Sequence, residues 1–305
     1  MHYSAGTVNS LENLPCYNGV EDYVTPLGKS GPISSFQCVT SGGIGLFQES
    51  FSSRLRYQEA QTGDAIYFGL FLPGRARVRF ESFYHVKPFV VCWQGNPRRE
   101  YEYVVEKGTR QFIVEVPRSL VNARDWQLPL QPFMSFELGM VDLFVSRVQH
   151  FLDQAKQRRV KHVPAFENLA MELVELLCGD GVFQVSRPNY GKRTSSLHRR
   201  IVTEVDCLFH VDLDGINWTS KDLCRALDVP KRTLYDAFQG QLGIGPLELH
   251  RRMRLLHLRK LLLNADSERG VVTRLMGQAG FSHLGRTSVA YRNMFGESPT
   301  ETLFK

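Results

Sequence analysis

The carboxyl-terminal part of the chain contains two helix-turn-helix patterns in tandem. The first runs from Thr219 to Phe238 and the second from Val271 to Phe295. In the first pattern, apolar residues such as Leu223 and Leu234 recur at intervals of three and four, which is the spacing of an amphipathic helix. Pro230 suits the first turn of a new helix, because its missing N–H is not needed there. The pattern therefore predicts two helices joined by a short turn.

The second pattern repeats this arrangement with different residues. Apolar residues such as Leu275 and Met276 predict its first helix, and Leu284 to Phe295 predict its second. Gly280 supplies the turn between them, because glycine adopts the left-handed backbone at a helix end at little cost. We call the two patterns unit one and unit two.

A single long helix is predicted between the units. It starts at Pro246 and continues through LELHRRMRLLHLRKLLLN without a helix breaker. We expect its apolar stripe to consist of Leu249, Met253, Leu256 and Leu263. We expect its remaining faces to carry the basic residues Arg251, Arg252, Arg254, Arg259 and Lys260.

Tandem helix-turn-helix units are suited to reading two successive major-groove faces of a DNA duplex. The charge distribution agrees with this reading. The formal net charge is +6, and residues 193–305 contribute +5 of it, from 17 Lys and Arg against 12 Asp and Glu. A basic excess is what contact with phosphate requires, although a mild excess is also ordinary surface chemistry. We predict that residues 213–305 form an all-α domain that binds double-stranded DNA.

The motifs GxGPLxxxRRxRLxxxRxLL and VxxLxxxxGFxHLGRxSxxYRxxFGESPxxTL resemble the AraC/XylS family of bacterial transcription regulators. The resemblance covers about residues 215–303. The variant HLGR…FGESP…TL is similar to the branch that contains ethanolamine-operon activators. In this family the second helix of each unit enters the major groove. The resemblance implies a transcription activator with RNA polymerase as a partner, although the residues themselves leave activation and repression open.

Position by position, the resemblance implies a set of residues that contact DNA. Unit one would present Arg232, Tyr235 and Asp236 to the bases, and unit two would present Leu284, Gly285 and Val289. The whole expected set is Lys231, Arg232, Thr233, Tyr235, Asp236, Gln239, Arg252, His283, Leu284, Gly285, Arg286, Ser288 and Val289.

Three positions depart from the family pattern. Asp236 stands where a basic or polar residue is usual; its carboxylate can accept a hydrogen bond from cytosine N4 but repels phosphate. Unit two is poor in polar groups at its base-facing positions, so it either contacts thymine methyl groups or reads little. Met276 and Thr287 stand where a small residue and Phe are usual, which suggests a volume-conserving exchange. The alternative is an ordinary core methionine and a solvent-facing threonine.

The first third of the chain has the period-two pattern of β-strands. Segments such as DAIYFGLFL, FVVCW and RQFIVEV alternate in polarity and are separated by turns such as Pro73-Gly74 and Lys107-Gly108-Thr109. We predict a β-barrel or sandwich over about residues 34–120, and the resemblance implies a cupin-like barrel. With the helical region, this gives an α+β fold in which residues 1–185 serve sensing or dimerisation.

Aromatic residues in the predicted barrel are the candidates for binding a small-molecule effector. Phe68, Phe80, Trp93 and Tyr101 either line an apolar pocket or fill the barrel interior. We expect no metal centre, because a metal needs a cluster of His and carboxylate ligands and the barrel contains a lone His85. We expect no cofactor either.

Residues 132–180 have the three-and-four spacing of helices. The face of Val141, Val145, Val148 and Leu152 predicts either a contact between two chains of a homodimer or simple packing against the barrel. Residues 186–212 are predicted to be a linker and a connecting helix, because the stretch FQVSRPNYGKRT at 183–194 has the composition of a linker and a third helical segment follows it.

The remaining features favour a cytoplasmic DNA-binding protein. The start of the chain lacks the pattern of a signal peptide, and no segment approaches the roughly 18 apolar residues of a membrane span. The 6 cysteines are scattered, which is typical of reduced thiols. The sequence contains neither a hydrolase motif nor a phosphate-binding loop, and its Arg, His and Asp residues are not clustered at catalytic spacing. We therefore expect that the protein is not an enzyme. The alternatives are an architectural protein that bends DNA and a cupin-type enzyme.

Overall fold

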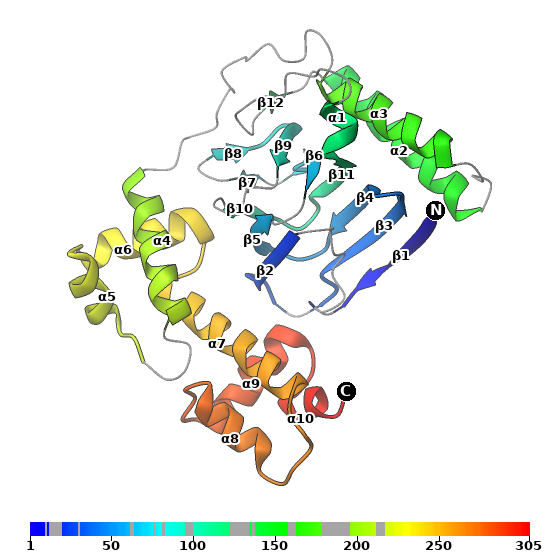
Figure 1. The fold of residues 1–305 in the computed structure, drawn as a ribbon. Helices are drawn as coiled ribbons and strands as arrows, with labels where there is room; N and C mark the ends of the chain where they lie inside the picture. The colour runs from blue at the N-terminus through cyan, green and yellow to red at the C-terminus, as the bar shows by residue number, and fades with distance from the viewer. Residues whose placement is uncertain are drawn as a thin grey trace. The chain divides into compact units, whose positions relative to one another are not determined.

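The computed structural model describes residues 1–9, 11, 20–29, 31–61, 64–75, 77–80, 83–94, 100–122, 134–135, 138–157, 163–178, 196–211 and 217–305. The chain divides into two compact domains (Figure 1). The sheet domain comprises Met1–Val24 and Pro32–Lys192, and the helical domain comprises Thr25–Gly31 and Arg193–Lys305. The FQVSRPNYGKRT segment of the predicted linker lies outside the described residues.

A seven-stranded sheet forms one layer of the sheet domain, with the strand order β1-β3-β4-β11-β6-β9-β12. Each neighbouring pair is antiparallel. The strands are β1 (His2–Val8), β3 (Ser34–Ser41), β4 (Ile44–Phe51), β6 (Ala65–Leu72), β9 (Phe89–Gln94), β11 (Arg110–Pro117) and β12 (Met134–Ser135).

A five-stranded sheet forms the second layer, with the order β2-β5-β10-β7-β8. Its strands are β2 (Val20–Pro26), β5 (Leu55–Gln61), β7 (Val78–Phe80), β8 (Phe83–His85) and β10 (Glu100–Val105). The predicted barrel or sandwich with helices is therefore confirmed as a two-sheet β domain.

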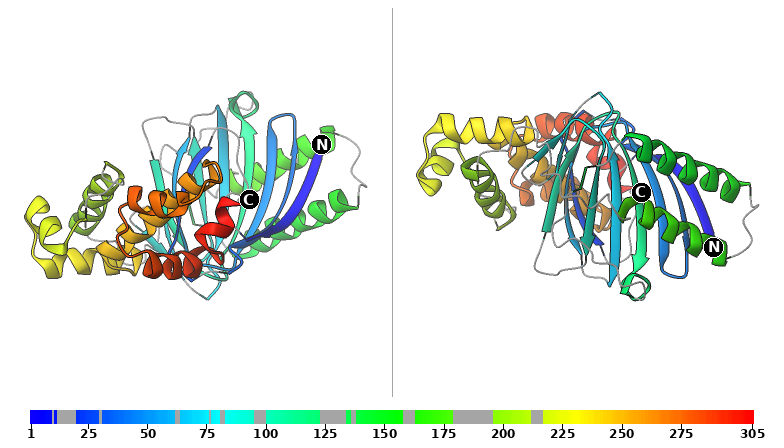
Figure 2. Two further views of the ribbon diagram at one scale, coloured as in Figure 1. Left: turned by 90° about the horizontal axis from the view of Figure 1, so that it is seen from below. Right: turned by 90° about the horizontal axis from the view of Figure 1, so that it is seen from above.

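The alternation of side chains along each strand builds two separate cores. On β11, Ile113 points into the core between the sheets, where it joins residues such as Tyr103. Phe112 and Val114 point to the opposite face, which is covered by α2 (Leu138–Lys156) and α3 (Val163–Cys178). Figure 2 shows these two helices side by side along the sheet. A short helix, α1 (Arg118–Asn122), follows β11.

The apolar face of α2 packs within its own chain. Val141, Val148 and Leu152 are 5%, 0% and 0% exposed in the core under the helices, and Val145 is half-buried against the same core. The interpretation of this face as a contact between two chains was therefore wrong. Burial against the sheet satisfies the same spacing, because any helix that covers a sheet needs one apolar stripe.

The aromatic effector candidates lie in different places. Phe68 is fully buried in the core beneath the helices, and Phe80 is 1% exposed in the core between the sheets. The structure therefore does not bring these two side chains to one pocket. The side chains of Trp93 and Tyr101 lie outside the described part of the structure.

Three charged residues lie together on the five-stranded sheet. Arg56 and Arg79, which are 1% and 2% exposed, both form ion pairs with Glu102. Burial raises the pKa of the Glu102 carboxyl, but the two guanidinium groups attract the carboxylate and donate hydrogen bonds to it, and together they lower the pKa to about 2. The carboxylate is thus what makes burial of two arginines tolerable.

The helical domain contains one more helix than the predicted 213–305 domain, because α4 belongs to it. Its helices are α4 (Ser196–Val211), α5 (Ser220–Leu227), α6 (Lys231–Leu242), α7 (Pro246–Leu263), α8 (Val271–Gln278), α9 (Leu284–Phe295) and α10 (Pro299–Leu303). On α4, Phe209 is buried and stacks on His250 of α7 with ring centroids 4.4 Å apart. The helix is part of the domain's core rather than a connection to it.

Candidate nucleic-acid interface

Local interactions define the two helices of unit one. Thr219 caps α5, since its hydroxyl accepts a hydrogen bond from the Asp222 backbone N–H at 3.3 Å. In return, Asp222 Oδ2 accepts hydrogen bonds from the Thr219 hydroxyl at 2.5 Å and from the Thr219 N–H at 3.0 Å. These two bonds to the carboxylate lower the pKa of Asp222. Asp228 ends α5 with a left-handed backbone (φ 51°), and Pro230 immediately precedes α6. The helix-turn-helix of unit one is thus confirmed.

The second helix of unit one, α6, has one buried and one exposed face. Leu234, Ala237 and Phe238 are fully buried. Arg232 is 93% exposed and its Nε lies 3.6 Å from Asp236 Oδ2, one helical turn later. The other expected DNA contacts on this helix divide by exposure: Lys231 and Gln239 are exposed, and Thr233 is half-buried.

Tyr235 has a different environment from the exposed residues around it. Its side chain is half-buried, and its hydroxyl lies 2.8 Å from Ser220 Oγ at the start of α5. A Cβ added at Gly245 would lie 3.3 Å from the tyrosine ring, so the ring also closes against the turn before α7. The sequence predicts that Tyr235 reads a base, and the structure shows that its side chain also holds the two helices of unit one together.

The turn of unit two depends on a glycine and an arginine. Gly280 has a positive φ of 76°, and a Cβ there would lie only 2.5 Å from a nitrogen of the Arg254 guanidinium. Glycine is therefore required both by the backbone and by the space. The turn places α9 after α8, as the sequence predicts.

The second helix of unit two, α9, exposes two large apolar side chains at positions expected to face the bases. Leu284 and Val289 are 40% and 62% exposed, and Gly285 lies beside Leu284 with open space where a Cβ would be. His283 and Arg286 are exposed, and Ser288 is half-buried.

Arg254 connects the two units through α7. Its Nε donates a hydrogen bond to the Ala279 carbonyl at 2.8 Å, and its Nη1 donates to Asn217 Oδ1 at 2.9 Å. Its guanidinium also lies 4.4 Å from the centroid of the Phe281 ring. Asn217 lies just before the cap of unit one, and Ala279 and Phe281 belong to unit two, so one buried side chain joins the start of the first unit to the turn of the second.

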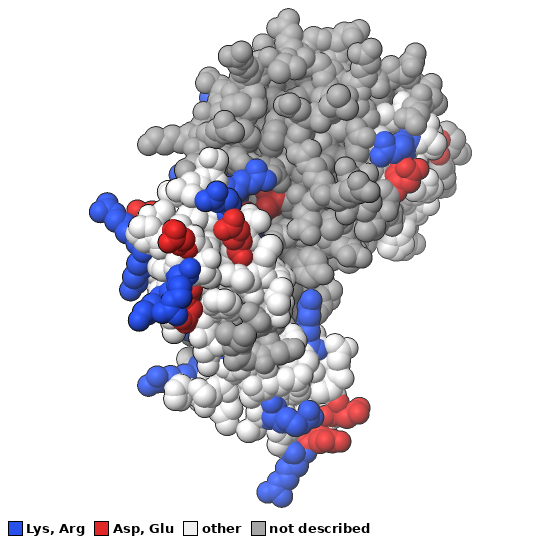
Figure 3. All heavy atoms as spheres, turned by 60° about the vertical axis from the view of Figure 1, so that its left-hand side comes forward, with Lys and Arg blue, Asp and Glu red and all other residues white. Residues whose placement is uncertain are grey.

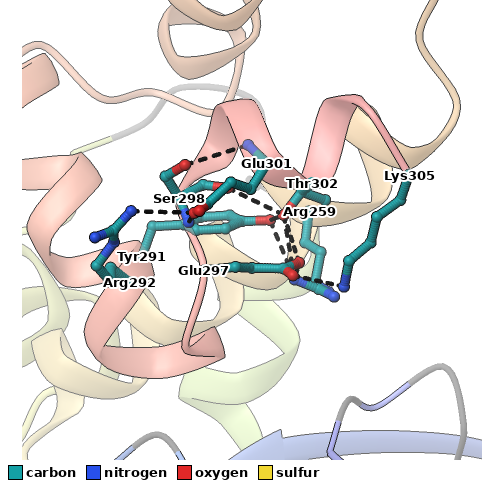
Figure 4. Close-up of polar contacts among 8 residues, drawn as sticks. All are labelled: Arg259, Tyr291, Arg292, Glu297, Ser298, Glu301, Thr302 and Lys305. Carbon is teal, nitrogen blue, oxygen red and sulfur yellow. Dashed lines mark hydrogen bonds and ion pairs between the residues drawn. The ribbon is translucent and has the colours of Figure 1, made fainter.

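A second buried arginine of α7 fixes the far end of unit two (Figure 4). Arg259 pairs with Glu297 at 2.7 Å, and Glu297 accepts a hydrogen bond from the Thr302 hydroxyl, also at 2.7 Å. The Tyr291 hydroxyl of α9 donates to Thr302 Oγ1 at 2.8 Å. Burial raises the pKa of the Tyr291 phenol, which stays protonated and able to donate. The network ties α9 to α7 and α10.

Sequence reasoning placed Arg254 and Arg259 on exposed faces of α7, and this was wrong. They are 6% and 3% exposed, whereas Leu263, expected in the apolar stripe, is 40% exposed. The reason is that α7 runs between unit one and unit two of the helical domain, so its side chains are buried on more than one side (Figure 1). Beside this network, Ser298 and Glu301 have the spacing of a capping box, and the structure contains that box at the start of α10.

Arg252 also differs from its expected role as a phosphate contact. Its side chain is 16% exposed and pairs with Glu248 at 2.8 Å. It donates further hydrogen bonds to the carbonyls of Pro26 and Gly28, in the segment Thr25–Gly31 of the same domain. These interactions hold the Arg252 side chain within the helical domain.

Basic side chains project from the surface of the helical domain, with acidic ones among them (Figure 3). The exposed Arg251 pairs with Glu248 at 2.7 Å, and Arg292 pairs with Glu301 at 3.1 Å. The surface therefore carries mixed charge with a modest basic excess. On α6, the positive charge of Arg232 is partly offset by the neighbouring carboxylate of Asp236.

Known proteins resemble the chain most clearly in this region. A family model described as a helix-turn-helix domain matches residues 223–304. The XylDLEGF operon transcriptional activator 1 of Pseudomonas putida is 23% identical over 275 residues, which cover 86% of this chain and 82% of that protein. The probable thc operon regulatory protein of Rhodococcus erythropolis is 36% identical over 85 residues, or 28% of this chain and 26% of that protein.

A solved structure, that of a probable AraC family transcriptional regulator from Rhodopseudomonas palustris CGA009, is 31% identical and covers 34% of this chain and 95% of its own, with a TM-score of 0.32. The helix-turn-helix match, the relatives and the geometry of α5–α6 and α8–α9 lead to one conclusion. This chain is a DNA-binding transcription regulator whose residues 223–304 form a helix-turn-helix domain.

Proposed function

We propose that the protein activates transcription from a small number of promoters by placing α6 and α9 in successive major grooves. The observation that carries this proposal is the exposed face of α6. It presents Arg232 and Asp236 to solvent on a helix whose opposite face is buried through Leu234 and Phe238. A recognition helix needs this division, because one face must be fixed by the domain while the other reaches base edges.

Activation and its partner are part of the same proposal. The Pseudomonas putida relative is named a transcriptional activator, which supports activation rather than repression for this chain. An activator acts through RNA polymerase, so the bacterial enzyme is the proposed protein partner, and the cytoplasm is the proposed location. Among the residues the structure describes, no helix combines the length and apolar character that crossing a membrane requires.

The sheet domain is proposed to regulate the helical domain, either by binding a small molecule or by pairing chains into a homodimer. The α2 face is buried within the chain and does not serve that pairing. The ethanolamine-operon branch rests only on the motif HLGR…FGESP…TL, whereas the relatives described above regulate the xylDLEGF and thc operons. The target genes are therefore best found by experiment.

Genome-wide mapping of bound sites with the full chain tests the proposal. We expect a few strong sites, each upstream of a gene whose transcript falls when the regulator is deleted. Arg232→Ala should lower the occupancy of these sites at an unchanged protein level. Dense binding without discrete sites would instead indicate an architectural protein that bends DNA. Discrete sites whose genes do not respond to the deletion would contradict the proposed activation.

A cupin-type enzyme is the alternative of a different class. The described residues contain no group of three or more His, Cys, Asp or Glu that could hold a metal ion. Elemental analysis of the purified full chain tests this alternative directly, because a stoichiometric bound metal would support a cupin-type enzyme.

A further inference from the structure

The exposed face of α9 is apolar at the positions that would meet DNA bases. Leu284 and Val289 are 40% and 62% exposed, although both are large apolar residues on a helix with a well-packed opposite face. That opposite face contains the buried Tyr291 and Met294. The packing of the domain therefore does not explain why Leu284 and Val289 are apolar.

The hydroxyl groups on this helix are engaged with its own backbone. Thr287 Oγ1 donates to the His283 carbonyl and Ser288 Oγ donates to the Leu284 carbonyl, both at 3.0 Å. The side chain of Thr287 is also 5% exposed and faces inward. These hydrogen bonds engage both hydroxyl groups, so Leu284 and Val289 expose apolar side chains while Arg286 exposes a charged one.

Gly285 adds an independent observation on the same face. It is absent from the residues with positive φ, and a Cβ at this position would meet nothing within 4 Å. Neither the backbone nor the packing of the free protein requires glycine here, and alanine would favour the helix. Close approach of another molecule to the helix backbone is the remaining reason for glycine.

We propose that unit two reads thymine methyl groups. Among the groups that the four base pairs present in the major groove, the thymine 5-methyl is the apolar one, and Leu284 and Val289 match it. The inference rests on the proposed function and assigns the class of DNA that this site selects: the half-site of unit two contains thymines contacted through their methyl groups. The half-site of unit one is read by the charged pair Arg232 and Asp236.

Replacement of thymine by deoxyuridine is the direct test, because it removes the methyl group and leaves the hydrogen-bonding edge unchanged. The DNA is a site recovered by mapping, with the thymines of one half replaced at a time. We expect replacement in one half to weaken binding by about fourfold for each contacted methyl group, the equivalent of about 0.8 kcal/mol. Replacement in the other half should leave the Kd unchanged.

Two variants assign the effect to α9. Val289→Ala should remove most of the difference between thymine and deoxyuridine in the sensitive half. Val211→Ala is the matched control, because Val211 is 83% exposed on α4 and loses the same methyl groups on substitution. Gly285→Ala should leave the unfolding temperature unchanged or higher and weaken binding to every form of the site.

The outcomes separate the inference from the proposed function. Absence of site-specific binding by the wild-type chain would overturn the proposed function itself. Site-specific binding that is equally strong on thymine and deoxyuridine in both halves would overturn the inference alone. An undiminished thymine preference in Val289→Ala would also overturn the inference, because α9 would not be the source of that preference.

Discussion

The Tyr235 hydroxyl lies 2.8 Å from Ser220 Oγ and joins the second helix of unit one to the first. This relationship predicts a positioning role for Tyr235. Tyr235→Phe should lower the free energy of unfolding by about 0.5–1.5 kcal/mol, since one hydrogen bond is lost. Binding should weaken on all operators alike, because the orientation of α6 changes.

Ser220→Ala is the matched variant for the same hydrogen bond. Its unfolding free energy should fall by a similar amount, and the double variant should show little further loss. Urea unfolding and titrations on operators with single base changes measure the two effects. A changed base preference in Tyr235→Phe at unaltered stability would instead make Tyr235 a base-reading residue.

Arg232 is expected to read a base and Arg286 to contact phosphate. Arg232→Ala should cost about 1–3 kcal/mol on the best operator and relax the preference at one position. Arg286→Ala should weaken all sequences similarly and reduce the salt slope by about one. Arg225→Ala, an exposed arginine on α5, is the control and should leave base preference unchanged. DNA-binding titrations at several salt concentrations measure both effects. An unaltered base preference in Arg232→Ala would show that α6 is not the helix that reads the bases.

The buried face of α2 predicts that its residues stabilise the fold rather than an interface. Leu152→Ala should lower the free energy of unfolding by about 2–5 kcal/mol, because it opens a cavity in the core. The control Leu143→Ala, at a residue that is 44% exposed, should change it by about 0.5 kcal/mol at most. In sedimentation experiments, the folded variants should have the same oligomeric state as the wild type. Dissociation caused by Leu152→Ala without a loss of stability would return this face to a role in pairing.

Met276 and Thr287 are 2% and 5% exposed, so the alternative of a solvent-facing Thr287 is wrong. Met276→Ala should cost roughly 2–4 kcal/mol through a cavity. Thr287→Phe should cost about 1–3 kcal/mol through overpacking, and it also removes the hydrogen bond to His283. If the two residues exchange volume, the double variant recovers much of the loss in a double-mutant cycle. Additive losses in denaturant unfolding would show that the two positions are independent.

The buried His250 predicts that the helical domain weakens in mild acid. Burial, and then the nearby positive charge of Arg254, lower the pKa of His250 to about 4. Since the unfolded chain takes up this proton at about pH 6.5, stability should be lost as the pH falls from about 6.5 to about 4. His250→Phe keeps the ring stacked on Phe209 and should flatten this part of the pH profile, by about 3 kcal/mol at most. An unchanged profile in chemical unfolding would assign the pH dependence to other groups.

The sequence predicts elements well where one periodicity decides the structure. Strands such as β6, β9 and β11 follow from alternation, and the helices of both units follow from three-and-four spacing. Gly280 was predictable for a different reason, because the left-handed backbone of the turn strongly favours glycine.

The errors concern which partner covers a face. The spacing of Val148 and Leu152 is the same for packing on a sheet and for pairing with another chain. Arg254 and Arg259 are buried because distant segments supply acceptors: a backbone carbonyl and Asn217 for one, and Glu297 for the other. A charged residue on a helix reveals no such acceptors in the sequence. The hydrogen bond between Tyr235 and Ser220 is not evident from the sequence for the same reason.

Footprinting of the full chain on a mapped promoter site tests the central claim most directly. The account predicts a bounded footprint with two protected major-groove segments on one side of the duplex, separated by about one helical turn of 10–10.5 base pairs. Protection of one segment should be lost with Arg232→Ala, while the other weakens less. Uniform protection that extends along the DNA as protein is added, without boundaries, would contradict a site-specific regulator.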